Sequence, residues 1–149
     1  MILFQMLFAF IVVYFTAFVF EAPKKLHKYI AILGAIGWLS YLILIENYNY
    51  IAATYFSSFI IAIFSHLFAR KFKVPVTVFF IPSFFPLVPG TQMYQAVYSY
   101  ITGDSALGNV YFLETLLKAG MIALAILTVD SLFRIYYKNI KSKNKLKKS

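Results

Sequence analysis

The order of apolar and polar residues along the chain predicts a membrane protein built from helices. Five segments are apolar enough to cross a bilayer, which takes roughly 20 residues in a helix. Their bounds are residues 2–20, 29–45, 51–69, 74–101 and 112–133. We therefore expect an all-α integral membrane protein of about five transmembrane helices. Its single domain covers residues 1–133, and a basic tail follows over residues 134–149.

The first segment has the length of a span but also resembles the apolar part of a signal peptide. A signal peptide has a basic region before its apolar stretch and a cleavage site of small residues. No lysine or arginine precedes Lys24, and Glu21-Ala22-Pro23 is a poor cleavage site. We expect residues 2–20 to be an uncleaved span.

The fourth segment, residues 74–101, has the pattern of a broken helix. Three prolines and a glycine interrupt it, at Pro82, Pro86, Pro89 and Gly90. Each proline lacks a donor and clashes with the preceding turn, and the residue before it is pushed out of the helical region. We expect the helix to break between Pro86 and Gly90 and to restart near Thr91.

A polar stripe follows the break, because Thr91, Gln95 and Ser99 are spaced to share one helical face. Irregular backbone inside a membrane is tolerated only within protein or beside a water-filled cavity. A restarting helix directs free N–H groups and a positive dipole end at such a cavity, as in transporters that bind carboxylates. The alternative is a proline-kinked span that only packs.

These features predict a substrate path in the fourth segment. Its expected residues are Pro86, Pro89, Gly90, Thr91, Tyr94, Gln95 and Ser99. Thr91 is expected to cap the restarted helix. A β-carbon at Gly90 is expected to clash with a substrate or to forbid the backbone angle of the turn.

Small and ionisable residues in other spans suggest further roles. Close helix packing is expected at Gly34, Gly37, Ala119 and Ala123, since small residues let membrane helices approach. His66 is either an interfacial hydrogen-bonding group or a proton relay. Asp130 is a candidate proton site too, with an ion pair to Arg134, four residues later, as the simpler explanation.

Composition narrows the class of protein. The chain of 149 residues is 62% hydrophobic and 13% charged, more apolar than a soluble domain of this size could hide. It has no cysteine, which excludes disulfides and thiolate chemistry. No catalytic grouping or metal cluster stands out. We expect a protein that is not an enzyme and that has no cofactor.

The net charge of +9 indicates an orientation. Residues 23–28, 70–73 and 134–149 hold 13 of the 14 basic residues, whereas the loops at 46–50 and 102–110 hold none. The positive-inside rule then places the N-terminus outside and the tail in the cytoplasm, in a bacterial-type inner membrane. A basic tail after a span is a topology signal, so we expect contact with lipid and none with nucleic acid.

The run PLVPGTQMYQAVYSYITGD, residues 86–104, resembles the signature of the threonine/serine exporter family. The small-residue run LGAIGW, residues 33–38, is similar to the second span of that family. Pro75 and the basic loop before it also lie where the family has them. The resemblance extends over nearly the whole chain.

The resemblance implies a small subunit that corresponds to the second membrane half of the family. It implies export of threonine and serine, or of small dicarboxylates, driven by the proton gradient together with a larger membrane subunit. The chain departs from this picture because no carboxylate lies near the middle of a span, so the partner is expected to supply one. The alternative is an assembly or scaffold subunit that transports nothing.

Overall fold

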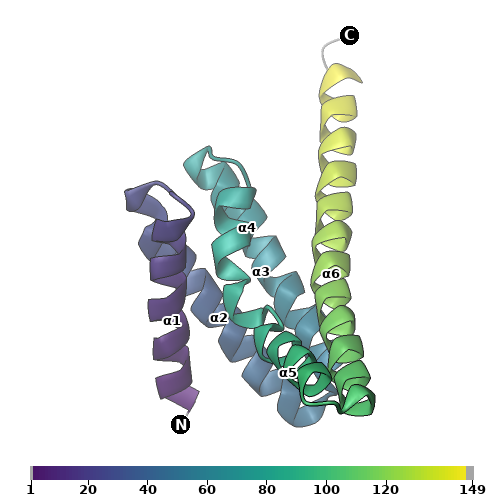
Figure 1. The fold of residues 1–149 in the computed structure, drawn as a ribbon. Coiled ribbons are helices and arrows are strands. Elements are labelled where there is room, and N and C mark those ends of the chain that lie inside the picture. The colour runs from purple at the N-terminus through teal and green to yellow at the C-terminus, as the bar shows by residue number, and fades with distance from the viewer. Residues whose placement is uncertain (1, 147–149) are drawn as a thin grey trace.

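The computed structural model describes residues 2–146, with side chains as far as Tyr136 and at Lys138 (Figure 1). The described chain is helical and contains no strand, so the predicted all-α class is confirmed. The elements are α1 (Ile2–Val19), η1 (Lys24–Leu26), α2 (His27–Asn47), α3 (Tyr50–Phe72), α4 (Thr77–Ser83), η2 (Phe85–Leu87), α5 (Gly90–Ile101) and α6 (Ser105–Leu146).

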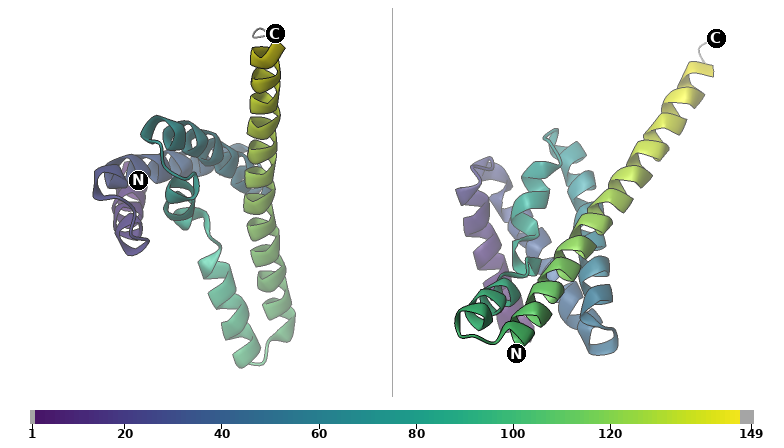
Figure 2. Two further views of the ribbon diagram at one scale, coloured as in Figure 1. Left: turned by 90° about the horizontal axis from the view of Figure 1, so that it is seen from above. Right: turned by 45° about the vertical axis from the view of Figure 1, so that its right-hand side comes forward.

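The helices form two units that we call the bundle and the arm. The bundle consists of α1 to α4, in which α2 packs against α1 and α3, and α4 packs against all three. The arm is the hairpin of α5 and α6, and α6 joins it to the bundle by packing along α3. Figure 2 shows the arm extending to one side of the bundle.

The core of the bundle consists of apolar side chains that are fully buried. They include Val13 of α1, Ile30 and Leu33 of α2, Ile61 of α3 and Phe79 of α4. Many large apolar side chains point outward instead, from α1 and along α6. Such a surface is unfavourable in water but suits the hydrocarbon of a bilayer.

Four helical stretches are long and apolar enough to cross a membrane. They are Ile2–Val19, Lys24–Asn47, Tyr50–Phe72 and Ser105–Tyr136. The fourth predicted span is instead divided into α4, η2 and α5. At about 1.5 Å per residue, neither α4 nor α5 alone matches a hydrocarbon core roughly 30 Å thick.

The basic stretch after the third span lies mostly within α3, contrary to the predicted loop over residues 70–73. Arg70 and Lys71 belong to the last turn of the helix. Lys73 ends it in the left-handed region, with φ of 55°, and the N–H of Val74 donates to the carbonyl oxygen of Ala69 at 2.9 Å. This arrangement is a common way to satisfy the last carbonyls of a helix.

The turn between α5 and α6 is much shorter than the predicted turn over residues 102–110, which is wrong. Helix α6 already begins at Ser105, because Asp104 accepts a hydrogen bond from the N–H of Leu107 at 3.0 Å and so caps the helix. Gly103 makes the reversal with φ of 89°.

The predicted boundary between the last span and the tail does not end a helix. Helix α6 continues across residue 134 to Leu146, while residues 147–149 of the predicted tail lie outside the described residues. In Figure 1 the turns after α1 and α3 lie at the same end of the molecule as the end of α6. The N-terminus and the turns after α2 and α5 lie at the opposite end.

Candidate functional site

Residues 82–90, which we call the proline segment, link the bundle to the arm. Pro82 lies inside α4 and Ile81 before it stays helical, so the expected effect of a proline on its preceding residue does not occur there. Val88 does adopt an extended conformation before Pro89, with φ of −60° and ψ of 130°. Ser83 holds the segment to α2 by donating to the carbonyl oxygen of Ile30 at 3.2 Å.

Helix α5 begins at Gly90, the last residue of the proline segment. Pro89 occupies the N-cap position, and no side chain makes a capping hydrogen bond there. Thr91 is the second residue of the helix, so the prediction that it caps this end is wrong. The positive end of the α5 dipole therefore lies beside the proline segment without a side-chain acceptor.

A cavity of about 210 Å³ lies where the bundle, the proline segment and the arm meet. Its lining comes from α2, α3, η2, the start of α5 and α6. The lining residues are Trp38, Tyr41, Thr54, Pro86, Leu87, Val88, Pro89, Thr91, Gln92 and Lys118. Three of the predicted path residues, Pro86, Pro89 and Thr91, are among them.

Gly90 differs from its prediction. Its backbone does not adopt a positive φ, and a β-carbon built on it has no atom within 4 Å. The expected conformational need for glycine at the turn is therefore wrong. The other part of the prediction, that a β-carbon at Gly90 would clash with a substrate, stays a prediction.

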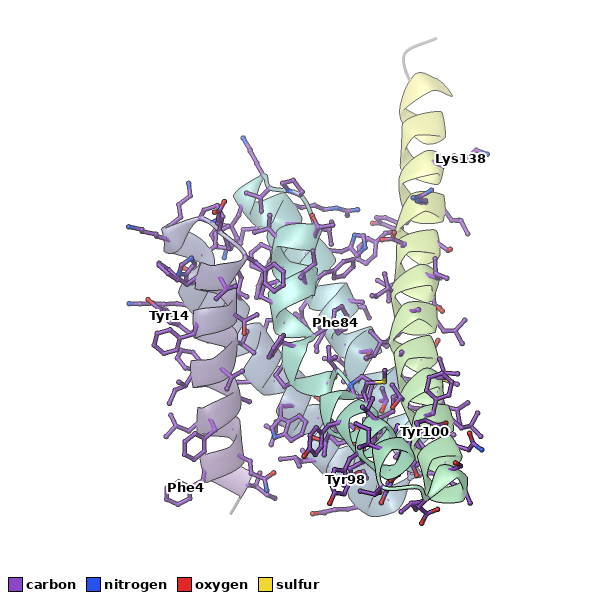
Figure 3. The ribbon with its side chains drawn as sticks, viewed as in Figure 1. Phe4, Tyr14, Phe84, Tyr98, Tyr100 and Lys138 are labelled. Atoms are coloured by element: carbon purple, nitrogen blue, oxygen red, sulfur yellow. The ribbon has the colours of Figure 1, made fainter. Side chains whose placement is uncertain are left out.

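The rest of the predicted path lies farther along α5 and outside the cavity lining. Gln95 is half-buried and Ser99 is buried. Tyr94 is 68% exposed and stacks on Tyr98, which Figure 3 shows on α5. The stripe of Thr91, Gln95 and Ser99 thus passes from an exposed position to a buried one, and only its first member reaches the cavity.

His66 and Asp130 meet across two helices. The Nε2 atom of His66 lies 2.7 Å from Oδ1 of Asp130, so the partner of Asp130 lies on α3, and the expected ion pair with Arg134 is not formed among the described residues. The imidazole stacks on Phe133 at 4.4 Å and contacts the edge of Phe80 at 5.6 Å. Three elements, α3, α4 and α6, therefore surround the pair.

The predicted packing residues divide into two groups. A β-carbon at Gly34 would lie 2.5 Å from Val13, and one at Gly37 would overlap Ile61. These glycines let α2 approach α1 and α3 within this chain. Ala119 and Ala123 are exposed on α6 and make no such close approach inside the described chain.

Comparison with known proteins identifies the family. Residues 5–132 match the family described as Threonine/Serine exporter, ThrE. The chain belongs to the threonine/serine exporter family. This match confirms the resemblance seen in the sequence, and together with the four apolar helices it makes the chain a multi-pass membrane protein of a transporter family.

A relative of this exporter-family chain occurs in Haemophilus influenzae (strain ATCC 51907 / DSM 11121 / KW20 / Rd), where it is named only as an uncharacterized protein. The two are 31% identical over 101 residues, which cover 67% of this chain and 34% of the relative. The chain thus aligns with about a third of the length of that relative. No solved structure matches.

Seven residues of the cavity lining were not predicted as part of a substrate path. They are Trp38, Tyr41, Thr54, Leu87, Val88, Gln92 and Lys118. Trp38, Tyr41 and Thr54 come from helices distant in sequence from the proline segment, whereas Leu87, Val88 and Gln92 are neighbours of the predicted residues along the chain. Lys118 had a signal, because it is the basic residue that lies outside the loops and the tail.

The side chains that line the cavity can bind a small molecule. No group of three or more His, Cys, Asp or Glu residues that could hold a metal ion occurs among the described residues. The lining residues carry one ammonium group, one amide, two threonine hydroxyls, the phenol of Tyr41 and the indole N–H of Trp38, beside aliphatic walls. A few polar groups in an apolar recess are typical of small-molecule sites.

Proposed function

We propose that this chain is the small subunit of a two-component secondary transporter that exports small carboxylate-bearing metabolites. The substrates would be threonine and serine, as the family name indicates, or small dicarboxylates. The observation that supports this most is the cavity at the proline segment. It lies beside interrupted backbone in an otherwise apolar, helical protein, the setting in which transporters bind substrate.

In this proposal α4, η2 and α5 together make one broken crossing, so that the chain crosses the membrane five times. The N-terminus lies outside, and the basic residues after α1, at the end of α3 and in the tail face the cytoplasm of an inner membrane. Support comes from Figure 1, in which the turns after α1 and α3 and the described end of α6 lie at one end of the molecule, and from the positive-inside rule.

A larger membrane subunit completes the exporter in this proposal. The chain aligns with 34% of the length of its Haemophilus influenzae relative, which is therefore much longer than the aligned region. The exposed side of α6, with Ala119 and Ala123, offers small residues against which another membrane helix could pack closely.

Proton coupling is assigned to His66 and Asp130 in the same proposal. Ionisable residues within membrane helices mark proton relays in pumps and transporters. These two form a direct pair at the contact between the bundle and the arm, where a change of charge would alter how the units fit.

The experiment is export from cells loaded with L-threonine, L-serine or succinate. The chain is expressed alone, with a larger membrane protein of the same family, or not at all. We expect export above background only when both proteins are present, together with their co-purification. Robust export by the chain reconstituted alone would refute the two-component proposal.

The second candidate function is that of a scaffold subunit that supports a transporting partner. The exposure of α5 and α6 favours it, because Tyr94, Leu113 and Leu127 are each more than half exposed and offer a large apolar contact surface. Co-purification and partner-dependent export would occur in this case too. Changes in the cavity would then leave the export rate per assembled complex unchanged.

A further inference from the structure

Lys118 is set apart from the other basic residues of the chain. The remaining 13 of the 14 lie in residues 23–28, 70–73 and 134–149. Lys118 lies in α6, within the apolar stretch Ser105–Tyr136. A charged side chain at such a position is energetically costly, and residues of this kind usually serve a substrate, an ion or a proton.

The surroundings of Lys118 do not neutralise it by a direct ion pair. Among the described residues, no carboxylate oxygen lies within 4.0 Å of its ammonium group, although Glu114 is one turn earlier on the same helix. The contact made by Nζ is with the ring of Tyr50, 5.6 Å from its centroid. An aromatic face attracts a cation but leaves its hydrogen-bond donors unused.

The same side chain lines the cavity at the proline segment. Thr54, which is fully buried, lines it as well, and its hydroxyl already donates to the carbonyl oxygen of Tyr50 at 2.7 Å. That hydroxyl oxygen is left as an acceptor. Gln92 adds an amide that both donates and accepts.

We propose that Lys118 binds the carboxylate of a small metabolite in this cavity, an inference that rests on the proposed export function. A carboxylate would give the ammonium group the direct ion pair that it lacks among the described residues, and the attraction between the two charges is strong where water is scarce. The acceptor on Thr54 and the amide of Gln92 suit an amine or hydroxyl of the same molecule. The volume, about 210 Å³, lies below the roughly 300–1,000 Å³ of sites for drug-sized ligands.

Trp38 provides a direct readout because it lines this cavity and is the only tryptophan of the chain. The purified full chain in lipid nanodiscs is titrated with L-threonine and, separately, with L-threonine amide, which lacks the negative charge. We expect a saturable change in tryptophan emission with L-threonine. The apparent Kd for the amide should be higher by roughly tenfold or more, which is the factor expected for the loss of a charge-assisted hydrogen bond.

Variants of the lysine test the assignment further. Lys118→Gln is expected to raise the apparent Kd for L-threonine by roughly tenfold or more, while Lys118→Arg keeps binding within a few-fold. The matched control is Lys138→Gln, a lysine of the same helix that points away from the bundle in Figure 3. It should bind as the unaltered chain does.

The outcomes test the role of Lys118 and the proposed export function separately. Equal responses to L-threonine and its amide, unchanged binding by Lys118→Gln, or no saturable emission change at all would overturn the role of Lys118. The ligand comparison needs no variant, so it decides even where Lys118→Gln fails to fold. Binding that depends on Lys118 without export by the assembled complex would contradict the proposed function and leave the carboxylate site standing.

Discussion

The Nε2 atom of His66 in α3 lies 2.7 Å from Oδ1 of Asp130 in α6. The two residues are 64 positions apart, and their contact joins the bundle to the arm. The side chain of His66 is 9% exposed and that of Asp130 is 35% exposed, so one partner is enclosed and the other reaches the surface. The pair therefore lies at the edge of the packed core and links two helices.

The first prediction concerns this pair. Asp130→Asn keeps the shape of the side chain but removes its carboxylate, so position 130 can no longer take up and release a proton. We expect the assembled complex to lose export of L-threonine against its concentration gradient. Transport of L-threonine down its concentration gradient should remain. The measurement is export from loaded cells with and without an imposed pH gradient, at matched membrane abundance.

The control for the proton pair is Glu46→Gln, which changes an exposed carboxylate at the end of α2. It should export as the unaltered chain does. Uphill export by Asp130→Asn at the normal rate would show that the pair is structural. In that case Asp130→Asn would only weaken the contact between α3 and α6, and the free energy of that contact would fall by about 1.5–3 kcal/mol.

The second prediction compares two glycines in helices. Gly34→Ala places a β-carbon 2.5 Å from Val13 and forces α1 and α2 apart, at a cost of roughly 1–3 kcal/mol. Gly120→Ala meets no atom within 4 Å and should stabilise α6 by about 0.5–1 kcal/mol through helix propensity. Thermal unfolding of the two purified variants tests this contrast. Equal melting temperatures would show that α2 does not pack closely on α1.

The third prediction concerns Gly90. A valine there meets open space and an ordinary backbone angle, so Gly90→Val should leave membrane abundance and melting temperature unchanged. Because Gly90 lies between Pro89 and Thr91, which both line the cavity, we expect the valine side chain to obstruct the substrate and export by the complex to fall strongly. Normal export at normal abundance would show that no substrate passes close to this residue.

A strained glycine supplies the contrast for Gly90. Gly103 has φ of 89°, a region that residues with a side chain rarely adopt. Gly103→Val should therefore lower the melting temperature although its β-carbon also meets nothing within 4 Å. The comparison of Gly90→Val with Gly103→Val separates an effect on substrate passage from an effect on the backbone.

The fourth prediction concerns topology. Because the chain has no cysteine, single cysteines can be introduced at positions 47, 105 and 142 and labelled in intact cells. Five crossings place Asn47→Cys and Ser105→Cys outside and Ser142→Cys inside. If α4, η2 and α5 did not cross together, Ser105→Cys would label only after permeabilisation and Ser142→Cys would label from outside.

The features that could be predicted from sequence are those with a local cause. The all-α class follows from long apolar stretches, and Val88 is extended because Pro89 follows it. Asp104 could have been predicted as an N-cap, because an aspartate directly before a helical pattern favours the start of a helix. The predicted turn over residues 102–110 did not take this into account. The role expected of Thr91 failed because the helix begins at Gly90, so that Pro89 and not Thr91 occupies the N-cap position.

Contacts between distant segments could not be read from the chain. A sequence shows that Asp130 and Arg134 share a helical face, but only the packing of α3 on α6 brings His66 to Asp130. The cavity likewise assembles Trp38, Thr54 and Lys118 from three helices. Gly34 and Gly37 were expected as packing residues, and the structure places their contacts inside the chain.

The central claim is that substrate reaches the cavity at the proline segment, and substrate protection of an introduced thiol tests it most directly. Thr91→Cys, which lines the cavity, is treated with a small water-soluble thiol reagent in the assembled complex, with buried Ser99→Cys as the control. We predict that Thr91→Cys reacts, that L-threonine slows the reaction in a saturable way, and that Ser99→Cys does not react. An unreactive Thr91→Cys, or one whose reaction L-threonine does not slow, would contradict a substrate path through this cavity.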